Sequence, residues 1–245
     1  QVVQIDVDPK EIGRNHKKTF GILGDARQAL SQLLEVIKIK TKPKQNQKIT
    51  FDKMRSNRYE NPANQVEPLA SYVKALRRGM PDDAILVADM TTIAYYARTH
   101  YQTYNPRSYF TTSYSGNLGS AFPTSLGIKV ARPNQAVVSI SGDGGFLFNS
   151  QELATAIQFD INVVAIVFND QSYSNVARDM KEIFNNKFLG SELKNPNFMK
   201  LADAYGVVGM KAENPDVLKK SLKEAIAMNK TVLIEVPIGQ MPSPF

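Results

Sequence analysis

The chain has 245 residues, of which 42% are hydrophobic, and it contains no cysteine. This length is enough for one large or two small domains, and the hydrophobic fraction indicates a globular core rather than disorder. The lack of cysteine excludes disulfides and thiolate zinc sites and is typical of a cytoplasmic protein. With only His16 and His100, we expect neither a Ser-His-Asp triad nor a multi-histidine metal site. No apolar run approaches the roughly 18 residues of a membrane span, so we expect no membrane partner.

The net charge of +7 is concentrated in one segment. From Lys38 to Arg58, eight basic residues stand against Asp52 alone, so this stretch accounts for the whole excess of positive charge. It also contains Pro43 and several polar amides, a composition typical of a solvated linker. We therefore expect a basic linker over residues 38–62 and no nucleic-acid partner.

The first 37 residues predict a small α/β fragment. Val2–Val7 is typical of a strand, and Ala26–Ile37 has the spacing of an amphipathic helix. Two elements cannot bury a core by themselves. We therefore expect residues 1–37 to complete a domain that begins outside this chain.

From residue 63 to residue 245, predicted strands alternate with predicted helices. The strands are Ala84–Ala88, Ala136–Ser141, Val163–Phe168 and Val232–Val236, and the helices are Val66–Arg78, Thr92–Thr99, Pro123–Val130, Ser150–Phe159, Asn197–Tyr205 and Val217–Met228. Continuous apolar runs are typical of parallel strands covered on both faces. The alternation predicts a Rossmann-like, doubly wound α/β fold with a parallel sheet, in which ligands bind where strands end and helices begin.

A glycine-rich turn after the strand Ala136–Ser141 is the strongest local signal. It contains Gly142-Asp143-Gly144-Gly145 and precedes a helix that Asn149 could cap, with Glu152 three residues further on. Glycines let backbone amides approach an anion, and the start of a helix favours negative charge. A carboxylate beside such an anion needs a cation between them, and Mg²⁺ takes these oxygen ligands. For the bare motif, an ordinary strand-to-helix turn is an equally good explanation.

The next strand ends in a second group of oxygen ligands. Val163–Phe168 is followed by Asn169-Asp170-Gln171-Ser172. Two adjacent parallel strands would bring both groups to one crevice. This arrangement favours a binding site over an ordinary turn.

The two motifs together resemble the signature of thiamine-diphosphate enzymes, in which GDG is followed after a fixed interval by Asn-Asn. Here Gly142-Asp143-Gly144 is followed after 24 residues by Asn169-Asp170. The stretches Gly142–Phe159, Gly116–Pro123 and Ile5–Gly13 are similar to the acetolactate synthase and benzoylformate decarboxylase group, so the resemblance covers essentially the whole chain. It implies that residues 1–37 are the C-terminal remnant of the middle domain and that residues 63–245 bind the diphosphate and Mg²⁺.

The resemblance also implies a role for each site residue. The metal ligands would be Asp143, Asp170 and the backbone carbonyl of Ser172, with Asn169 as the alternative to Asp170. Residues implied near the cofactor are Gly142, Gly144, Gly145, Thr91, Thr92 and Tyr173, where the amides of Gly144 and Gly145 would hold phosphate. Leu118 would bend the cofactor by pushing its pyrimidine ring towards the thiazolium, and the Gly116 carbonyl would accept a hydrogen bond from the pyrimidine amino group. Helix capping is an equally good explanation for Thr91.

Some features depart from the family pattern. Asp170 replaces an asparagine, Ser174-Asn175 stand where Gly-Met is frequent, and the chain lacks the tryptophan that acetolactate synthases place over the substrate. The catalytic glutamate of the family comes from a separate pyrimidine-binding domain, normally of a neighbouring subunit, and we find no such domain in this sequence.

The resemblance implies an enzyme that decarboxylates a small 2-oxo acid or ligates the product, as a C–C lyase or as an acyl or aldehyde transferase. It implies thiamine diphosphate and Mg²⁺ as cofactors, and it leaves FAD open as a further cofactor that no residue of this chain supports. The expected partners are the pyrimidine-binding domain and further copies in a dimer or tetramer, which would cover exposed apolar surface around Leu118 and Phe122. The alternatives are a non-catalytic cofactor-binding module and, less favoured because Gly-x-Gly-x-x-Gly is missing, a Rossmann dinucleotide binder.

Overall fold

The structure is a computed structural model that describes residues 2–40, 48–112 and 115–244. It divides into two compact units, Gln1–Arg55 and Ser56–Phe245. Each unit is described by itself. The bounds expected for the middle-domain remnant, the linker and the cofactor domain stay predictions.

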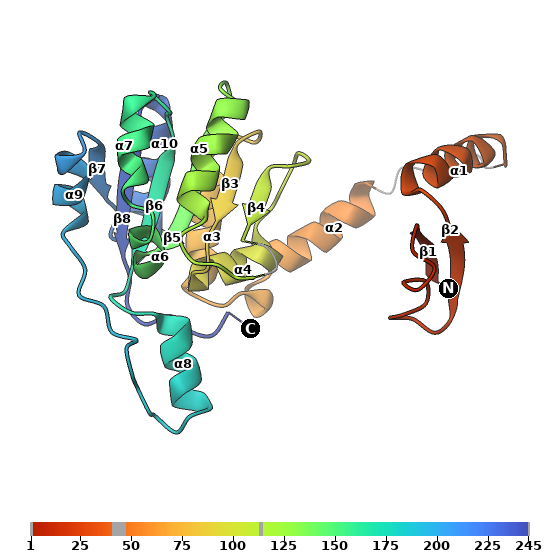
Figure 1. The fold of residues 1–245 in the computed structure, drawn as a ribbon, viewed down its shortest axis with the longest axis horizontal. Coiled ribbons are helices and arrows are strands. Elements are labelled where there is room, and N and C mark those ends of the chain that lie inside the picture. The colour runs from red at the N-terminus through yellow and green to blue at the C-terminus, as the bar shows by residue number, and fades with distance from the viewer. Residues whose placement is uncertain (1, 41–47, 113–114, 245) are drawn as a thin grey trace. The chain divides into compact units, whose positions relative to one another are not determined.

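The smaller unit contains two parallel strands and a helix (Figure 1). Strand β1 (Val2–Asp6) pairs with β2 (Thr19–Leu23), and helix α1 (Ala26–Lys40) follows. The strand and helix expected here are present, whereas β2, a short run that contains a glycine, was not predicted. Among the described residues of this unit, no hydrophobic side chain is fully buried. Its apolar residues therefore do not form a core of their own.

Helix α2 (Lys48–Tyr59) occupies much of the stretch expected to be a solvated linker. Residues 41–47 of that stretch lie outside the described part of the chain. The Arg58 guanidinium at the end of α2 donates to the backbone carbonyl of Thr99 (Nη2 to O, 3.0 Å). The polar composition did not predict this helix, because charged residues are typical of solvated linkers and are also good helix formers.

The larger unit is built on a six-stranded, wholly parallel sheet with strand order β4-β3-β5-β6-β8-β7. Its strands are β3 (Ile85–Ala88), β4 (Tyr109–Thr111), β5 (Val137–Gly142), β6 (Val164–Asn169), β7 (Val208–Lys211) and β8 (Val232–Pro237). The predicted Rossmann-like α/β class is confirmed. The four predicted strands are the central ones, and the two that were missed, β4 and β7, lie at the edges.

Helices cover both faces of this sheet (Figure 1). The helices of this unit are the 3₁₀ helix η1 (Pro62–Asn64), α3 (Leu69–Gly79), α4 (Thr92–His100), α5 (Ala121–Ala131), α6 (Asp143–Leu147), α7 (Glu152–Gln158), α8 (Ser174–Glu182), α9 (Phe198–Ala204) and α10 (Pro215–Ala227), of which η1 and α8 contribute no residue to the cores against the sheet. Strand β6 shows how the two cores form: Ile166 and Phe168 face α3, α4 and α10, while Ala165 and Val167 face α5, α7 and α9. This double burial explains why the central strands are unbroken apolar runs.

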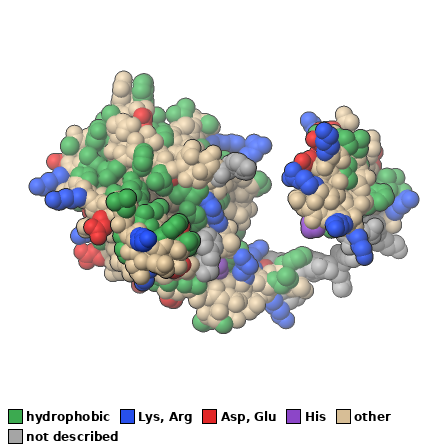
Figure 2. All heavy atoms as spheres, turned by 60° about the horizontal axis from the view of Figure 1, so that its bottom comes forward, with side chains coloured by type: hydrophobic (Ala, Val, Ile, Leu, Met, Phe, Trp, Pro, Cys, Tyr) green, Lys and Arg blue, Asp and Glu red, His purple; other side chains and the backbone are tan. Residues whose placement is uncertain are grey.

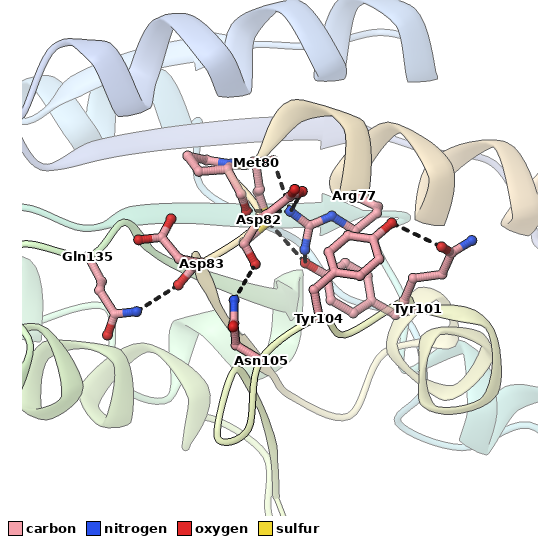
Figure 3. Close-up of polar contacts among 10 residues, drawn as sticks. Arg77, Met80, Asp82, Asp83, Tyr101, Tyr104, Asn105 and Gln135 are labelled. Carbon is pink, nitrogen blue, oxygen red and sulfur yellow. Dashed lines mark hydrogen bonds and ion pairs between the residues drawn. The ribbon is translucent and has the colours of Figure 1, made fainter. Parts of the chain in front are cut away.

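The Arg77 side chain ties the loop before β3 to the loop after α4 (Figure 3). Its guanidinium donates to the Met80 carbonyl at 2.9 Å and to the Tyr101 hydroxyl at 3.0 Å. The ring of Tyr104 lies 5.1 Å from the guanidinium carbon, within cation–π range. These contacts hold the N-terminal end of β3. The candidate site lies at the opposite, carboxyl ends of the strands.

Candidate functional site

A cavity of about 260 Å³ lies at the carboxyl ends of β3, β5 and β6. All eleven residues that the sequence pointed to as ligand contacts line it: Thr91, Thr92, Gly116, Leu118, Gly142, Asp143, Gly144, Gly145, Asp170, Ser172 and Tyr173. The structure therefore brings them together, while the chemical role of each stays a prediction. The lining residues that sequence reasoning missed are Met90, Tyr95, Phe168, Ser174, Asn175 and Val176.

Two carboxylates share this cavity. Asp143 begins α6 and is 2% exposed, and its Oδ1 accepts a hydrogen bond from the Gly144 amide at 2.9 Å. Asp170 follows β6 and accepts a hydrogen bond from the Ser174 hydroxyl. Burial raises the pKa of the Asp170 carboxyl, and the negative charge of Asp143 raises it further, although the Ser174 bond opposes this shift. Acids that repel each other in one cavity are stabilised together by a cation.

The side chain of Asn169 is engaged outside the cavity. Its Nδ2 donates to Glu235 Oε1 at 2.8 Å, and its Oδ1 accepts from Asn195 Nδ2 at 2.9 Å. Asn169 is not among the residues that line the cavity, whereas Asp170 is. The geometry therefore favours Asp170 over Asn169 as an oxygen ligand for a metal.

The turn at Gly144 leaves no room for a side chain. A Cβ at Gly144 would lie 2.4 Å from Cε1 of Tyr173 and 2.9 Å from Cδ1 of Leu193. Gly142 packs more loosely, because its Cβ would lie 3.6 Å from Cβ of Thr91. Glycine at position 144 thus lets the loop after β6 lie directly on the turn after β5.

The loop that carries Leu118 is held by polar groups on both sides, the buried Asp89 and the part-buried Asn149. Gly119, at φ +81°, donates its amide to Asp89 Oδ2 at 2.8 Å and accepts from Asn149 Nδ2 at 2.7 Å. Asn149 was expected to cap the following helix, and that expectation is wrong. Gln151 occupies the N-cap of α7, since the short helix α6 intervenes and places the Asn149 amide against the Gly119 carbonyl.

Asp89 was missed by sequence reasoning although it directly follows the apolar run of β3. It is fully buried, and it also accepts from its neighbour's amide, Met90 N, at 2.8 Å. Burial raises the pKa of its carboxyl, while these hydrogen bonds lower it. A Cβ at Gly145 would lie 3.3 Å from Asp89 Oδ2, so the carboxylate packs closely against the turn after β5. Through its bond to Gly119, it also fixes the Leu118 loop to the end of β3. An acid at the end of an apolar strand was the signal that could have revealed it.

Thr91 occupies the N-cap position of α4, but its side chain makes no capping hydrogen bond. Helix capping therefore does not account for this threonine. The Thr92 hydroxyl donates weakly to Asn175 Oδ1, at 3.4 Å. Thr91 and Thr92 both line the cavity where α4 begins.

Leu118 is half-buried and lines the cavity. Phe122, in contrast, is 1% exposed, and its ring centroid lies 5.5 Å from that of Phe146. The expectation of exposed apolar surface at Phe122 is therefore wrong, because α5 turns this side chain into the core. Of these two residues, Leu118 lines the cavity and Phe122 does not.

Comparisons with known proteins agree with this geometry. Residues 89–236 match the family described as thiamine pyrophosphate enzyme, C-terminal TPP binding domain. The match covers more than half of the chain, so the chain belongs to this family of thiamine-diphosphate enzymes.

Its relatives include a probable acetolactate synthase large subunit of Methanocaldococcus jannaschii, 32% identical over 97% of this chain and 42% of the relative. The acetolactate synthase isozyme 3 large subunit of Escherichia coli is 29% identical over 97% of this chain and 43% of the relative. A sulfoacetaldehyde acetyltransferase of Castellaniella defragrans is 28% identical over 96% of this chain and 44% of the relative. The chain thus spans less than half the length of these relatives. In its described part, no helix has the length and apolar character needed to cross a membrane.

Proposed function

We propose that this chain binds thiamine diphosphate through Mg²⁺ and forms the diphosphate-binding half of an active site that acts on a small 2-oxo acid. The reaction is a decarboxylation, with transfer of the resulting carbanion to an acceptor as in acetolactate synthesis. The observation that carries the proposal is the pair of carboxylates, Asp143 and Asp170, in one cavity. A diphosphate can lie beside two acids only when a cation screens them, and Mg²⁺ commonly combines one or two carboxylates with phosphate oxygens.

The residues present fit this metal and cofactor. Asp143, Asp170 and the Ser172 carbonyl are hard oxygen donors, and the acids at positions 143 and 170 repel each other without a cation. The Gly145 amide would hold a phosphate oxygen at the start of α6. The Gly144 amide, which donates to Asp143 Oδ1 in this structure, would take the same role by exchanging that partner for phosphate. Thiamine diphosphate, when bound, supplies the stabilisation of the carbanion, while the protein orients it.

Leu118 is the residue that we propose to set the bent shape of the cofactor, beside the Gly116 carbonyl. Its support is that it lines the cavity and belongs to neither hydrophobic core of the larger unit. We expect Leu118→Ala to lower turnover of the complete enzyme on the order of a hundredfold, with a much smaller loss of cofactor affinity. Equal losses in turnover and affinity would show that Leu118 only contributes to binding.

The other half of the site is proposed to come from a pyrimidine-binding domain that carries the catalytic glutamate, within a cytoplasmic homodimer or tetramer. Exposed apolar side chains in the segment that follows the second site motif, of which Val176 lines the cavity, support a covered surface here. They are Val176, Ile183, Phe184, Phe188 and Leu189, in and just after α8. Figure 2 shows that hydrophobic side chains are spread over the visible face of the larger unit. Large apolar side chains that are exposed close together along one segment are typical of an interface.

The test of the proposed function is calorimetry of thiamine diphosphate binding in Mg²⁺ and in EDTA. We expect binding in Mg²⁺ and little or none in EDTA, with affinity restored when Mg²⁺ is added back. Equal affinity under both conditions would remove the metal from the site. No binding under either condition would overturn the function itself.

A further inference from the structure

Asn195 lies between the two motifs of the site although it lines no part of the cavity. Its Nδ2 donates one hydrogen bond to Asp143 Oδ2 at 2.6 Å and another to Asn169 Oδ1 at 2.9 Å. The first is short for an N–H···O bond, as expected when the acceptor is a carboxylate. One side chain thus joins the turn after β5 to the end of β6.

The orientation of this amide is determined by its surroundings. Both acceptors are oxygens, so a flipped amide would place its own oxygen against a carboxylate and a second carbonyl. The observed orientation leaves the oxygen of this amide unsatisfied. Asn195 Oδ1 is buried and has no hydrogen-bond partner among the described residues. A buried, unsatisfied acceptor is uncommon in folded proteins and calls for an explanation.

The hydrogen bonds continue on both sides of Asn195. Asn169 Nδ2 in turn donates a hydrogen bond to Oε1 of Glu235 in β8, at 2.8 Å. On the other side, the remaining oxygen of Asp143 accepts from the Gly144 amide at 2.9 Å. Each Asp143 oxygen therefore has a donor of its own, one in the turn after β5 and one in the segment before α9, and these two bonds hold the carboxylate in one orientation.

The segment that carries Asn195 is itself held against the site. The Leu193 amide donates to the Gln171 carbonyl, and the Tyr173 amide donates to the Ser191 carbonyl, both at 2.8 Å. Asn195 is therefore positioned by backbone pairing between residues 171–173 and 191–193. Its amide is placed before any ligand arrives.

We propose that Asn195 is a positioning residue for the metal site: its amide orients the Asp143 carboxylate towards Mg²⁺ and keeps Asn169 out of the cavity, which leaves Asp170 as the second ligand. This inference rests on the proposed function, because it assigns Asn195 to the metal of that site. Carboxylates that bind metals are commonly hydrogen-bonded by outer residues in this way, and loss of such a partner weakens metal binding by about 10–100-fold.

The experiment compares Asn195→Ala with Asn197→Ala. Asn197 is two residues away and caps α9 by accepting from the Lys200 amide at 3.0 Å, and it has no hydrogen bond to Asp143. The readout is the affinity for Mn²⁺, a spectroscopic substitute for Mg²⁺, measured by electron paramagnetic resonance at saturating thiamine diphosphate. Thermal unfolding of both variants is recorded in parallel.

We expect Asn195→Ala to weaken Mn²⁺ binding by about 10–100-fold, and Asn197→Ala to lower the melting temperature without changing Mn²⁺ affinity. Should Asn195→Ala not fold, Asn195→Ser replaces it, because a hydroxyl donates to only one of the two acceptors. The serine variant should also lower the affinity for Mn²⁺. Wild-type affinity in the Asn195 variant, or an equal loss in the Asn197 variant, would overturn the positioning role alone. A wild-type protein that binds no Mn²⁺ with the cofactor would overturn the proposed function and this role together.

Discussion

At the scale of single residues, the two acids of the cavity differ in how firmly they are held. Asp143 is almost fully buried, and each of its oxygens accepts from a nitrogen donor. Asp170 accepts from a hydroxyl, and burial raises the pKa of its carboxyl. Asp143 is therefore held in one orientation for the metal that we propose, whereas Asp170 would gain most from a cation that screens its charge.

The first prediction separates these two acids. Asp143→Ala should weaken cofactor binding beyond the roughly 10–100-fold typical of an outer partner, because it removes a held ligand. Asp170→Ala should weaken binding less, and Asp170→Asn should be tolerated, since the amide keeps one ligand oxygen. Calorimetry with thiamine diphosphate and Mg²⁺ measures all three.

Asp179→Ala is the control for charge, because Asp179 is an exposed acid of α8 that does not line the cavity. We expect it to bind like the wild type. An Asp170→Asn variant as impaired as Asp170→Ala would show that the second ligand has been misassigned.

At the scale of elements, the ends of α3 and α4 depend on the buried contact between Arg77 and Tyr101 (Figure 3). Burial raises the pKa of the Tyr101 hydroxyl to about 12, from an ordinary value of 10.0. The folded state therefore holds this proton more tightly than the unfolded state. The resulting stability is fully present below pH 10 and is lost as the pH rises through about 12.

The second prediction follows from the raised pKa of Tyr101 in the folded state. Tyr101→Phe should lower the free energy of unfolding at neutral pH by about 1–3 kcal/mol, since a bond to a charged donor is lost. It should also reduce the fall in stability between pH 10 and about 12. Some fall should remain, because burial raises the pKa of Tyr109 in the same way. Urea unfolding followed by circular dichroism measures both effects.

Tyr104→Phe is the matched control for this pair. Its hydroxyl donates to Gln102 in an exposed setting, and the ring that stacks on Arg77 is retained. We expect wild-type pH dependence. A Tyr101→Phe variant with an unchanged alkaline slope would mean that this hydroxyl ionises as freely in the folded state as in the unfolded state.

At the scale of the whole molecule, the exposed apolar side chains around α8 point to assembly. Leu189 is 84% exposed and Phe184 is 58% exposed, both within the segment that follows the second site motif. A two-fold axis would cover two such surfaces and complete two sites at once.

The third prediction is that the protein self-associates through this segment. Sedimentation velocity should show a dimer or larger species, and Leu189→Asp should weaken association at least about tenfold, near 1.4 kcal/mol. Val130→Asp makes a comparable change, from an apolar side chain to an acid, at an exposed position near the end of α5 that does not line the cavity, and it should leave association unchanged. A monomer at every concentration tested would contradict the proposed assembly.

The sequence by itself determined the central strands and the position of the site. Strands β3, β5, β6 and β8 are continuous apolar runs, and Asp143 and Asp170 follow two of them. These signals are local, because double burial needs unbroken apolarity and the topology of a parallel sheet then gathers the strand ends.

Only the tertiary structure decided which groups meet. The edge strands β4 and β7 are short and owe their conformation to the neighbour with which they pair. The links from Asp89 to Gly119 and from Asn195 to Asp143 join residues 30 and 52 positions apart in the chain. No local pattern encodes such pairs, since a buried polar group is satisfied by whatever donor or acceptor the fold places beside it.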